Sequence, residues 1–233
     1  MTVPTFTYVE RKDIEEILET LLNDNPNHCK DTVIAVLTGI AGTGKTRIAK
    51  RFFDEYTYLF WVSGSRSDAK TYLTTELKKP DDDGDFSIRD SLEKLEDWIL
   101  VIDDLTDESI KEYIPETNGH VIITSRVRLD WGITVDVGEM NTDEALELLL
   151  GTEPITENAK QIVEELGHIP LAIARARQLN LPADCLLEYV QSHPNEFDNL
   201  AIWNSAFNKI YNENTIAIQI LCGLSYTPTD KIN

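Results

Sequence analysis

Residues 39–46 read Gly-Ile-Ala-Gly-Thr-Gly-Lys-Thr, and they are the most specific signal in the sequence. It is a complete match to the pattern GxxxxGK[ST]. Glycines in such a loop let backbone N–H groups turn towards phosphate oxygens, and the following helix directs the positive end of its dipole at them. The pattern therefore predicts a phosphate-binding loop that follows a strand and opens a helix.

The last two residues of the stretch carry the reactive side chains. The amine of Lys45 can reach the β- and γ-phosphates of a nucleotide, and the hydroxyl of Thr46 can ligate Mg²⁺. A glycine-rich turn with an exposed lysine is the alternative interpretation. The residues expected around the phosphates and the metal are Gly39, Gly42, Thr43, Gly44, Lys45 and Thr46.

The segments around this loop alternate between two patterns. Strand-like apolar runs occupy 33–38, 58–62, 98–103, 120–124 and 133–137. Segments with helical character occupy 11–24, 45–54, 67–78 and 88–96. Strands that alternate with helices predict an α/β fold with a parallel sheet flanked by helices, as in P-loop NTPases. We expect this α/β domain, with its N-terminal lead-in helix, to span residues 1–138.

From about Asn141 the strand-like runs stop. Short apolar helical patterns follow, with Gly151 and Gly167 as stop signals and Pro170 and Pro182 where helices could begin. This predicts a small all-helical subdomain at 139–196.

Two carboxylates follow the strand-like run WILVI. Asp103 and Asp104 come where the run ends, at the carboxyl edge of a parallel sheet, which is where ligands bind in open α/β folds. Asp103 is the candidate partner of Mg²⁺, and Asp104 is the candidate base that orients an attacking water. A paired Asp can also be a plain turn signal.

A cation follows the neighbouring strand-like run HVIIT. Arg126 could reach the γ-phosphate there and distinguish ATP from ADP. The alternative is a surface arginine at a strand end. The candidate catalytic residues are thus Lys45, Asp104 and Arg126.

Composition narrows the class of protein. The 233 residues include 41 acidic and 21 basic side chains, a net charge of −20, which would repel nucleic acid and anionic membrane surfaces. The three cysteines lack metal-binding spacing, and the sequence has neither a signal-peptide pattern nor an apolar run of membrane-spanning length. We expect a soluble, cytoplasmic protein that binds neither nucleic acid nor membranes.

Taken together, these motifs resemble the NB-ARC family, the nucleotide-binding switch of plant disease-resistance proteins, animal apoptosome proteins and many fungal and bacterial STAND NTPases. Residues 8–12, Tyr-Val-Glu-Arg-Lys, are similar to the family's hhGRE motif, with Glu10 in place of its glycine. The resemblance implies that Val9 and Arg11 contact adenine. It also implies that Thr124-Ser125-Arg126 is the family's TTR or TSR sensor, in which Arg126 monitors the γ-phosphate.

The resemblance extends into the helical part of the chain. Residues 166–173, Leu-Gly-His-Ile-Pro-Leu-Ala-Ile, are similar to the family's GLPLAL motif, with His168 in place of the usual small residue. Pro170 and Leu171 would then lie near the adenine. Residues 197–233 resemble the first part of a winged-helix subdomain that stops early.

The resemblance implies ATP or ADP with Mg²⁺ as ligands and a signalling role of the kind seen in innate immunity and programmed cell death. ADP would hold a closed monomer, ATP would favour an open form that self-associates, and slow hydrolysis would reset the switch. Effector and sensor parts would come from outside this chain. The alternative is a continuously cycling AAA+-type ATPase, a loader or remodelling enzyme. A nucleic-acid-acting ATPase is disfavoured by the charge.

Overall fold

The computed structural model describes residues 8–22, 31–53, 56–78, 86–117 and 119–197. The chain divides into two compact units, Met1–Met140 and Asn141–Asn233, which we describe separately. None of the helices in the described ranges is long and apolar enough to cross a membrane.

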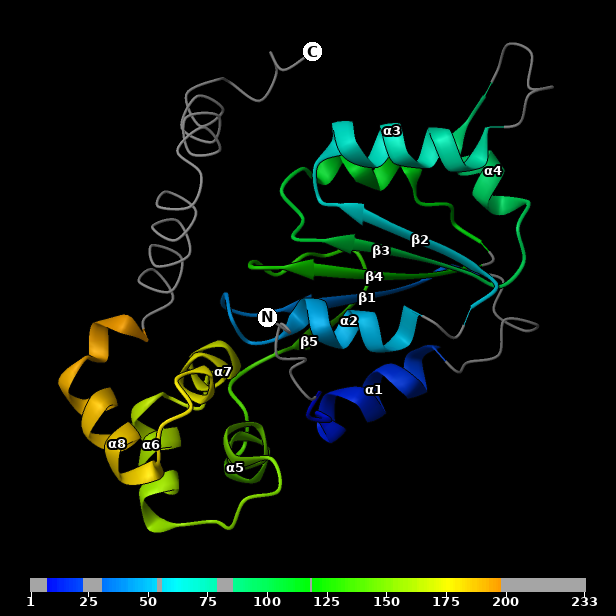
Figure 1. Ribbon diagram of the computed structural model, residues 1–233. Helices are drawn as coiled ribbons and strands as arrows, with labels where there is room; N and C mark the ends of the chain where they lie inside the picture. Colours follow the sequence, from blue (N-terminus) through cyan, green and yellow to red (C-terminus); the bar gives the residue numbers. More distant parts are fainter. Residues whose placement is uncertain (1–7, 23–30, 54–55, 79–85, 118, 198–233) are drawn as a thin grey trace, which may run out of the picture. The chain divides into compact units, whose positions relative to one another are not determined.

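The first unit is built on a five-stranded sheet (Figure 1). Its strands are β1 (Val33–Thr38), β2 (Tyr58–Ser63), β3 (Trp98–Asp103), β4 (Gly119–Ser125) and β5 (Ile133–Asp136). Their order is β2-β3-β4-β1-β5, and every neighbouring pair is parallel. The predicted parallel α/β sheet is confirmed, with strand ends that differ from the predicted ones by one residue at most.

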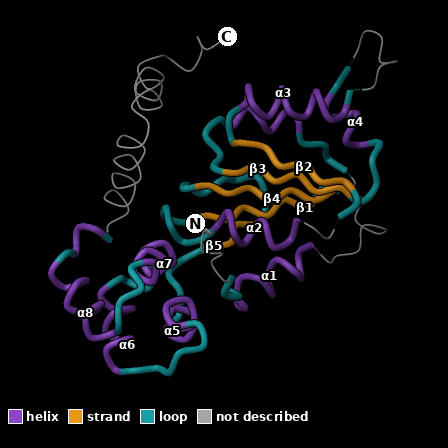
Figure 2. The backbone as a smooth tube through the Cα atoms, viewed as in Figure 1, coloured by secondary structure: helices purple, strands orange, loops and turns teal. Residues whose placement is uncertain are grey.

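Helices cover both faces of this sheet (Figures 1 and 2). One face carries α1 (Lys12–Leu22) and α2 (Lys45–Phe53), and the other carries α3 (Arg66–Leu77), α4 (Ile88–Glu93) and the 3-10 helix η1 (Glu108–Tyr113). The sequence pattern did not predict η1. This short helix is capped at its N-terminus by Asp107, whose side chain accepts a hydrogen bond from the Ser109 N–H.

Side-chain alternation along β3 explains why this strand is apolar throughout. Trp98, Leu100 and Ile102 pack into the core beneath α3 and α4, whereas Ile99 and Val101 pack into the core beneath α1 and α2. Successive strand residues point to opposite faces, so a strand covered on both sides needs apolar residues at every position. The last residue, Asp103, is only half-buried and ends the run at the carboxyl edge.

The described part of the second unit is helical. It contains α5 (Thr142–Leu150), α6 (Glu157–Glu165), α7 (Pro170–Gln178), α8 (Ala183–Ser192) and the 3-10 helix η2 (Pro194–Glu196). Local signals set the helix starts: Asn141 and Glu144 form a reciprocal capping box on α5, and Pro170 occupies the first turn of α7. The winged-helix segment expected at 197–233 lies, apart from Phe197, outside the described residues, and the division at 138 and 196 stays a prediction.

Candidate functional site at the carboxyl edge of the sheet

The glycine-rich stretch forms the connection between β1 and α2, as its pattern predicts. Gly42 and Gly44 have φ values of 89° and 97°, which side chains rarely tolerate. At Gly39 a Cβ atom would lie 2.3 Å from the Val137 carbonyl oxygen. The loop is closed internally by the buried Thr43, whose Oγ1 donates to the Ile40 carbonyl at 3.0 Å. Glycine is therefore required by both conformation and close backbone contact.

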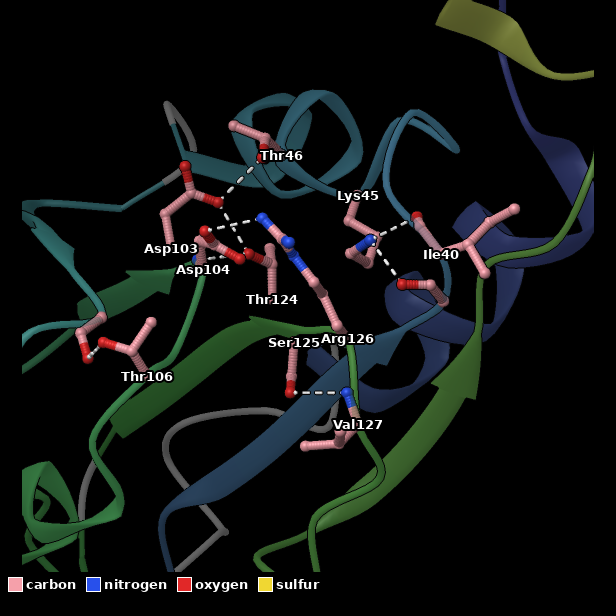
Figure 3. Close-up of polar contacts among 12 residues, drawn as sticks. Ile40, Lys45, Thr46, Asp103, Asp104, Thr106, Thr124, Ser125, Arg126 and Val127 are labelled. Atoms are coloured by element: carbon pink, nitrogen blue, oxygen red, sulfur yellow. Dashed lines mark hydrogen bonds and ion pairs between the residues drawn. The ribbon is translucent and has the colours of Figure 1, made fainter. Parts of the chain in front are cut away.

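Lys45 folds back over this loop (Figure 3). Its Nζ donates to the carbonyl oxygens of Gly39 and Ile40, each at 2.7 Å. Partial burial lowers the pKa of Lys45, and the nearby Arg126 cation lowers it further, against the opposing effect of Asp104 and Asp103. Lys45 is the first residue of α2, and the first N–H groups of a helix have no carbonyl partner within it. An amine and helix N–H groups at one loop fit a phosphate chain.

Thr46 and Asp103, the two predicted metal ligands, are brought together. Thr46 Oγ1 donates to Asp103 Oδ1 at 2.9 Å, although the residues are 57 positions apart. Hydroxyl and carboxylate oxygens are ligands that Mg²⁺ prefers. Mg²⁺ is commonly bound by one or two protein oxygens together with phosphates and waters. No group of three or more His, Cys, Asp or Glu side chains suited to a metal occurs among the described residues. The Thr46–Asp103 pair fits a Mg²⁺ that is shared with phosphates.

Asp104 and Arg126 are also brought together. Arg126 Nη2 lies 3.3 Å from Asp104 Oδ2, and both side chains are largely exposed, at 64% and 58%. The candidate base and the candidate sensor therefore form an ion pair at the sheet edge. Two positions further on, Arg128 pairs separately with Asp136.

Two residues at this edge were not singled out for a role by sequence reasoning. Thr124, which entered only as part of the sensor motif, contacts both aspartates through its hydroxyl. Gly64, which follows β2, accepts hydrogen bonds from the N–H groups of Thr106 and Asp107 at 3.1 and 3.2 Å. The available signal was position: both residues lie where a strand ends beside the strand that carries the aspartates.

Val9 and Arg11, the residues expected at the adenine, are both buried. The Arg11 guanidinium reaches the connection after β5, where Nη2 donates to the Glu139 carbonyl at 2.8 Å and more weakly to that of Gly138 at 3.5 Å. The backbone N–H of Arg11 donates to Glu15 Oε1 at 2.8 Å. This geometry ties the start of α1 to residues 138–139, and the adenine contact stays a prediction.

Pro170 and Leu171 begin α7 in the second unit, where both are half-buried. Before them, Gly167 and His168 have left-handed φ values of 61° and 54°, and the His168 N–H donates to the Val163 carbonyl at 3.0 Å. This is the bond pattern of a helix ending in a Schellman-type turn. The glycine and the histidine therefore build the turn between α6 and α7. Contact of Pro170 and Leu171 with adenine stays a prediction.

Comparison with known proteins identifies the same family that the sequence motifs resemble. The family model of the NB-ARC domain matches residues 10–149. Among solved structures, a STAND (Signal Transduction ATPase with Numerous Domains) protein with a tetratricopeptide repeat sensor from Pyrococcus horikoshii matches with 21% identity and a TM-score of 0.50. The match covers 71% of this chain and 29% of that one. Cdc6p from Pyrobaculum aerophilum matches with 19% identity and a TM-score of 0.49, over 82% of this chain and 65% of that one.

A search of curated proteins gave no significant match. The chain spans less than a third of the length of the STAND protein, so that similarity shows the fold alone. The family match, in contrast, spans more than half of the 233 residues and includes the phosphate-binding loop, both aspartates and Arg126. This chain belongs to the NB-ARC family of nucleotide-binding P-loop NTPases.

Proposed function

We propose that this NB-ARC protein is an adenine-nucleotide switch. ADP holds a closed monomer, ATP favours an open form that self-associates, and slow hydrolysis resets the protein. The observation that carries the proposal is the exposed ion pair between Asp104 and Arg126, 3.3 Å apart. Exposed ion pairs contribute about 0–1 kcal/mol, so a stronger partner for either side chain can separate them.

A γ-phosphate is such a partner for Arg126. Arginine–phosphate hydrogen bonds are charge-assisted and roughly twice as strong as neutral ones. ADP, which lacks the γ-phosphate, would leave the Arg126–Asp104 pair intact, whereas ATP would draw Arg126 away and free the Asp104 carboxylate. This difference in contacts is what a ligand needs in order to shift a protein between two conformations.

The same residues then have consecutive roles. When bound, Mg²⁺ supplies positive charge against the β- and γ-phosphates, and Thr46 and Asp103 would hold it. Lys45 leaves the carbonyls of Gly39 and Ile40 to bind the phosphates, with Gly42, Thr43 and Gly44 around them. Asp104, released from Arg126, orients the attacking water, and Lys45 and Arg126 stabilise the charge that develops.

Adenine recognition is assigned to Val9, Arg11, Pro170 and Leu171. Two of these residues belong to the first unit and two to the second. We propose that nucleotide occupancy drives signalling in the cytoplasm, with self-association in the ATP state as its output.

The test is to denature the freshly purified protein, identify the released nucleotide by chromatography and quantify it. Light scattering after size-exclusion chromatography then gives the mass with ADP and with a non-hydrolysable ATP analogue. We expect stoichiometric ADP, a monomer with ADP and a larger species with the analogue. Equal mass and shape with both ligands would contradict the switch, and turnover faster than about one per second would favour the cycling ATPase instead.

Asp104→Asn separates binding from hydrolysis. The amide keeps the shape of the carboxylate and tolerates the left-handed backbone of this position, where φ is 54°. We expect nucleotide affinity close to wild type and hydrolysis slowed by at least tenfold. Loss of affinity equal to the loss of hydrolysis would remove the assigned role of Asp104 as base.

A further inference from the structure

The buried hydroxyl of Thr124 lies between two consecutive aspartates. Thr124 Oγ1 donates to Asp103 Oδ1 at 2.7 Å and accepts the backbone N–H of Asp104 at 2.8 Å. The residue is 1% exposed at the carboxyl end of β4, which pairs with β3. A threonine hydroxyl has a single proton to donate, and here that proton goes to Asp103. Figure 3 draws Thr124, Asp103 and Asp104 with these contacts as dashed lines.

The first contact fixes the orientation of the Asp103 carboxylate. Asp103 Oδ1 receives hydrogen bonds from two hydroxyls, that of Thr124 at 2.7 Å and that of Thr46 at 2.9 Å. Rotation of the carboxylate would break both bonds. Thr46 is exposed and belongs to the phosphate-binding loop, whereas Thr124 is buried in the sheet. Thr124 is therefore the anchor on the rigid side of Asp103.

The second contact fixes the backbone turn at Asp104. A φ of 54° is disfavoured for a residue with a side chain, so the turn needs external support. Thr124 supplies it twice, because its hydroxyl accepts the Asp104 N–H and its carbonyl accepts the Leu105 N–H at 2.9 Å. Gly64 packs against the same turn from the β2 side. A Cβ at Gly64 would lie 2.3 Å from both the Asp104 backbone carbonyl oxygen and Leu105 Cα, so the turn is closely packed there as well.

We propose that Thr124 is a positioning residue that sets both carboxylates at once: Asp103 towards the metal and Asp104 towards the attacking water. The inference rests on the proposed Mg²⁺–nucleotide site and adds to it the residue that orients its two carboxylates. Thr124 acts through Asp103 and Asp104 and needs no contact with the nucleotide. Since the same hydroxyl serves both aspartates, its loss affects metal-dependent binding and hydrolysis together.

The chain offers a matched control one residue away. Ser125 is also 1% exposed, and its Oγ accepts the Val127 N–H at 3.1 Å. Ser125→Ala therefore removes a buried hydroxyl from the same strand end without touching a bond to either aspartate. Thr124→Val removes the hydroxyl and keeps the shape, and Thr124→Ser keeps the hydroxyl.

The experiment is titration calorimetry of ADP and of a non-hydrolysable ATP analogue, in Mg²⁺ and in EDTA, on wild type and the three variants. We expect Mg²⁺ to tighten nucleotide binding by the wild type. In Thr124→Val, the ratio of the affinity in Mg²⁺ to the affinity in EDTA should be at least tenfold smaller than in the wild type, whereas the affinity in EDTA should stay within twofold of wild type. Thr124→Ser and Ser125→Ala should keep the full gain. If Thr124→Val does not fold, Thr124→Cys replaces it, since a thiol is a weak donor.

A merely structural role of Thr124 predicts a different result. Affinity would then fall equally in Mg²⁺ and in EDTA, or the full gain from Mg²⁺ would persist in Thr124→Val, and either outcome would overturn the inference. Wild-type protein that binds nucleotide equally well in Mg²⁺ and EDTA would overturn the proposed metal site itself. Failure of the metal site can be distinguished from failure of the Thr124 inference, because the first is seen with the wild type alone and the second only with the variants.

Discussion

Arg126 Nη2 and Asp104 Oδ2 lie 3.3 Å apart at the ends of neighbouring strands β4 and β3, and neither side chain is buried. The contact is thus easy to break, yet it joins the two side chains that the proposed switch would use to sense a γ-phosphate and to activate water. An exposed pair contributes little to folding, so its effect should appear in ligand preference instead.

The first prediction concerns Arg126→Gln. The folding stability should stay within about 0.5 kcal/mol of wild type. Affinity for a non-hydrolysable ATP analogue should fall by roughly tenfold, about 1.4 kcal/mol, while ADP affinity changes less than twofold. Calorimetric titrations measure both. Arg128→Gln is the control, because Arg128 lies at the same strand end but pairs with Asp136. Equal losses for ADP and the analogue would refute a γ-phosphate sensor.

The second prediction concerns Lys45→Ala. Lys45 Nζ donates to the carbonyl oxygens of Gly39 and Ile40, which water can satisfy in the variant. Affinity for ADP and for the ATP analogue should both fall by about 10- to 100-fold, since hydrogen bonds to charged groups contribute about 1.5–3 kcal/mol. The melting temperature without nucleotide should change little. Lys50→Ala, on the exposed side of α2, is the matched control. Unchanged ADP binding in Lys45→Ala would show that this loop does not hold the phosphates.

The third prediction concerns Gly64→Ala. The added Cβ would stand 2.3 Å from backbone atoms of Asp104 and Leu105, which cannot move without disturbing β3. Such overpacking costs roughly 1–3 kcal/mol of folding stability, measured by urea unfolding. At Gly138, by contrast, a Cβ would meet no atom within 4 Å, so Gly138→Ala should be nearly neutral. Equal stability of the two variants would mean that the Asp104 turn has more freedom than the contacts indicate.

The fourth prediction concerns pH. His120 is 3% exposed on β4, and within the described part of the chain its Nε2 has no hydrogen-bond partner. Burial lowers the pKa of His120, and Asp97 opposes this only in part. The folded state therefore prefers the neutral ring, and protonation favours unfolding. The contribution of His120 is full above the unfolded pKa of about 6.5 and is lost as the pH falls below it.

His120→Phe removes this titration and keeps a ring beside Tyr56, whose centroid lies 5.4 Å from that of His120. Urea unfolding between pH 7.5 and 5 measures the effect. Wild type should lose more stability than the variant over this range, since all other titrating groups are common to both. Parallel pH profiles would show that His120 does not titrate differently in the folded and unfolded states.

Much of the fold was predictable because its signals are local. The loop at 39–46 carries its own conformational requirement in its glycines, and the run at 98–103 is apolar throughout because helices cover both faces of its strand. Parallel strands of one sheet place their carboxyl ends at the same edge. The contact between Thr46 and Asp103, at 2.9 Å, lies at that edge, as the rule predicts.

Other relationships needed the tertiary structure. The sequence does not state that β3 lies between β2 and β4, and this order is what brings Gly64 and Thr124 to the two sides of the Asp104 turn. The burial of the Arg11 guanidinium on the carbonyls at 138–139 likewise joins segments more than 120 positions apart.

Sequence patterns were sufficient to predict the class of fold, the phosphate-binding loop and the residue types at the sheet edge, because glycine conformation, strand periodicity and motif spacing depend on neighbours along the chain. The folded structure was needed to establish which of those residues contact one another: Arg126 with Asp104, and Thr124 with both aspartates. Such contacts depend on strand order and register, which are set by packing and hydrogen bonds between distant segments, and no local pattern encodes them.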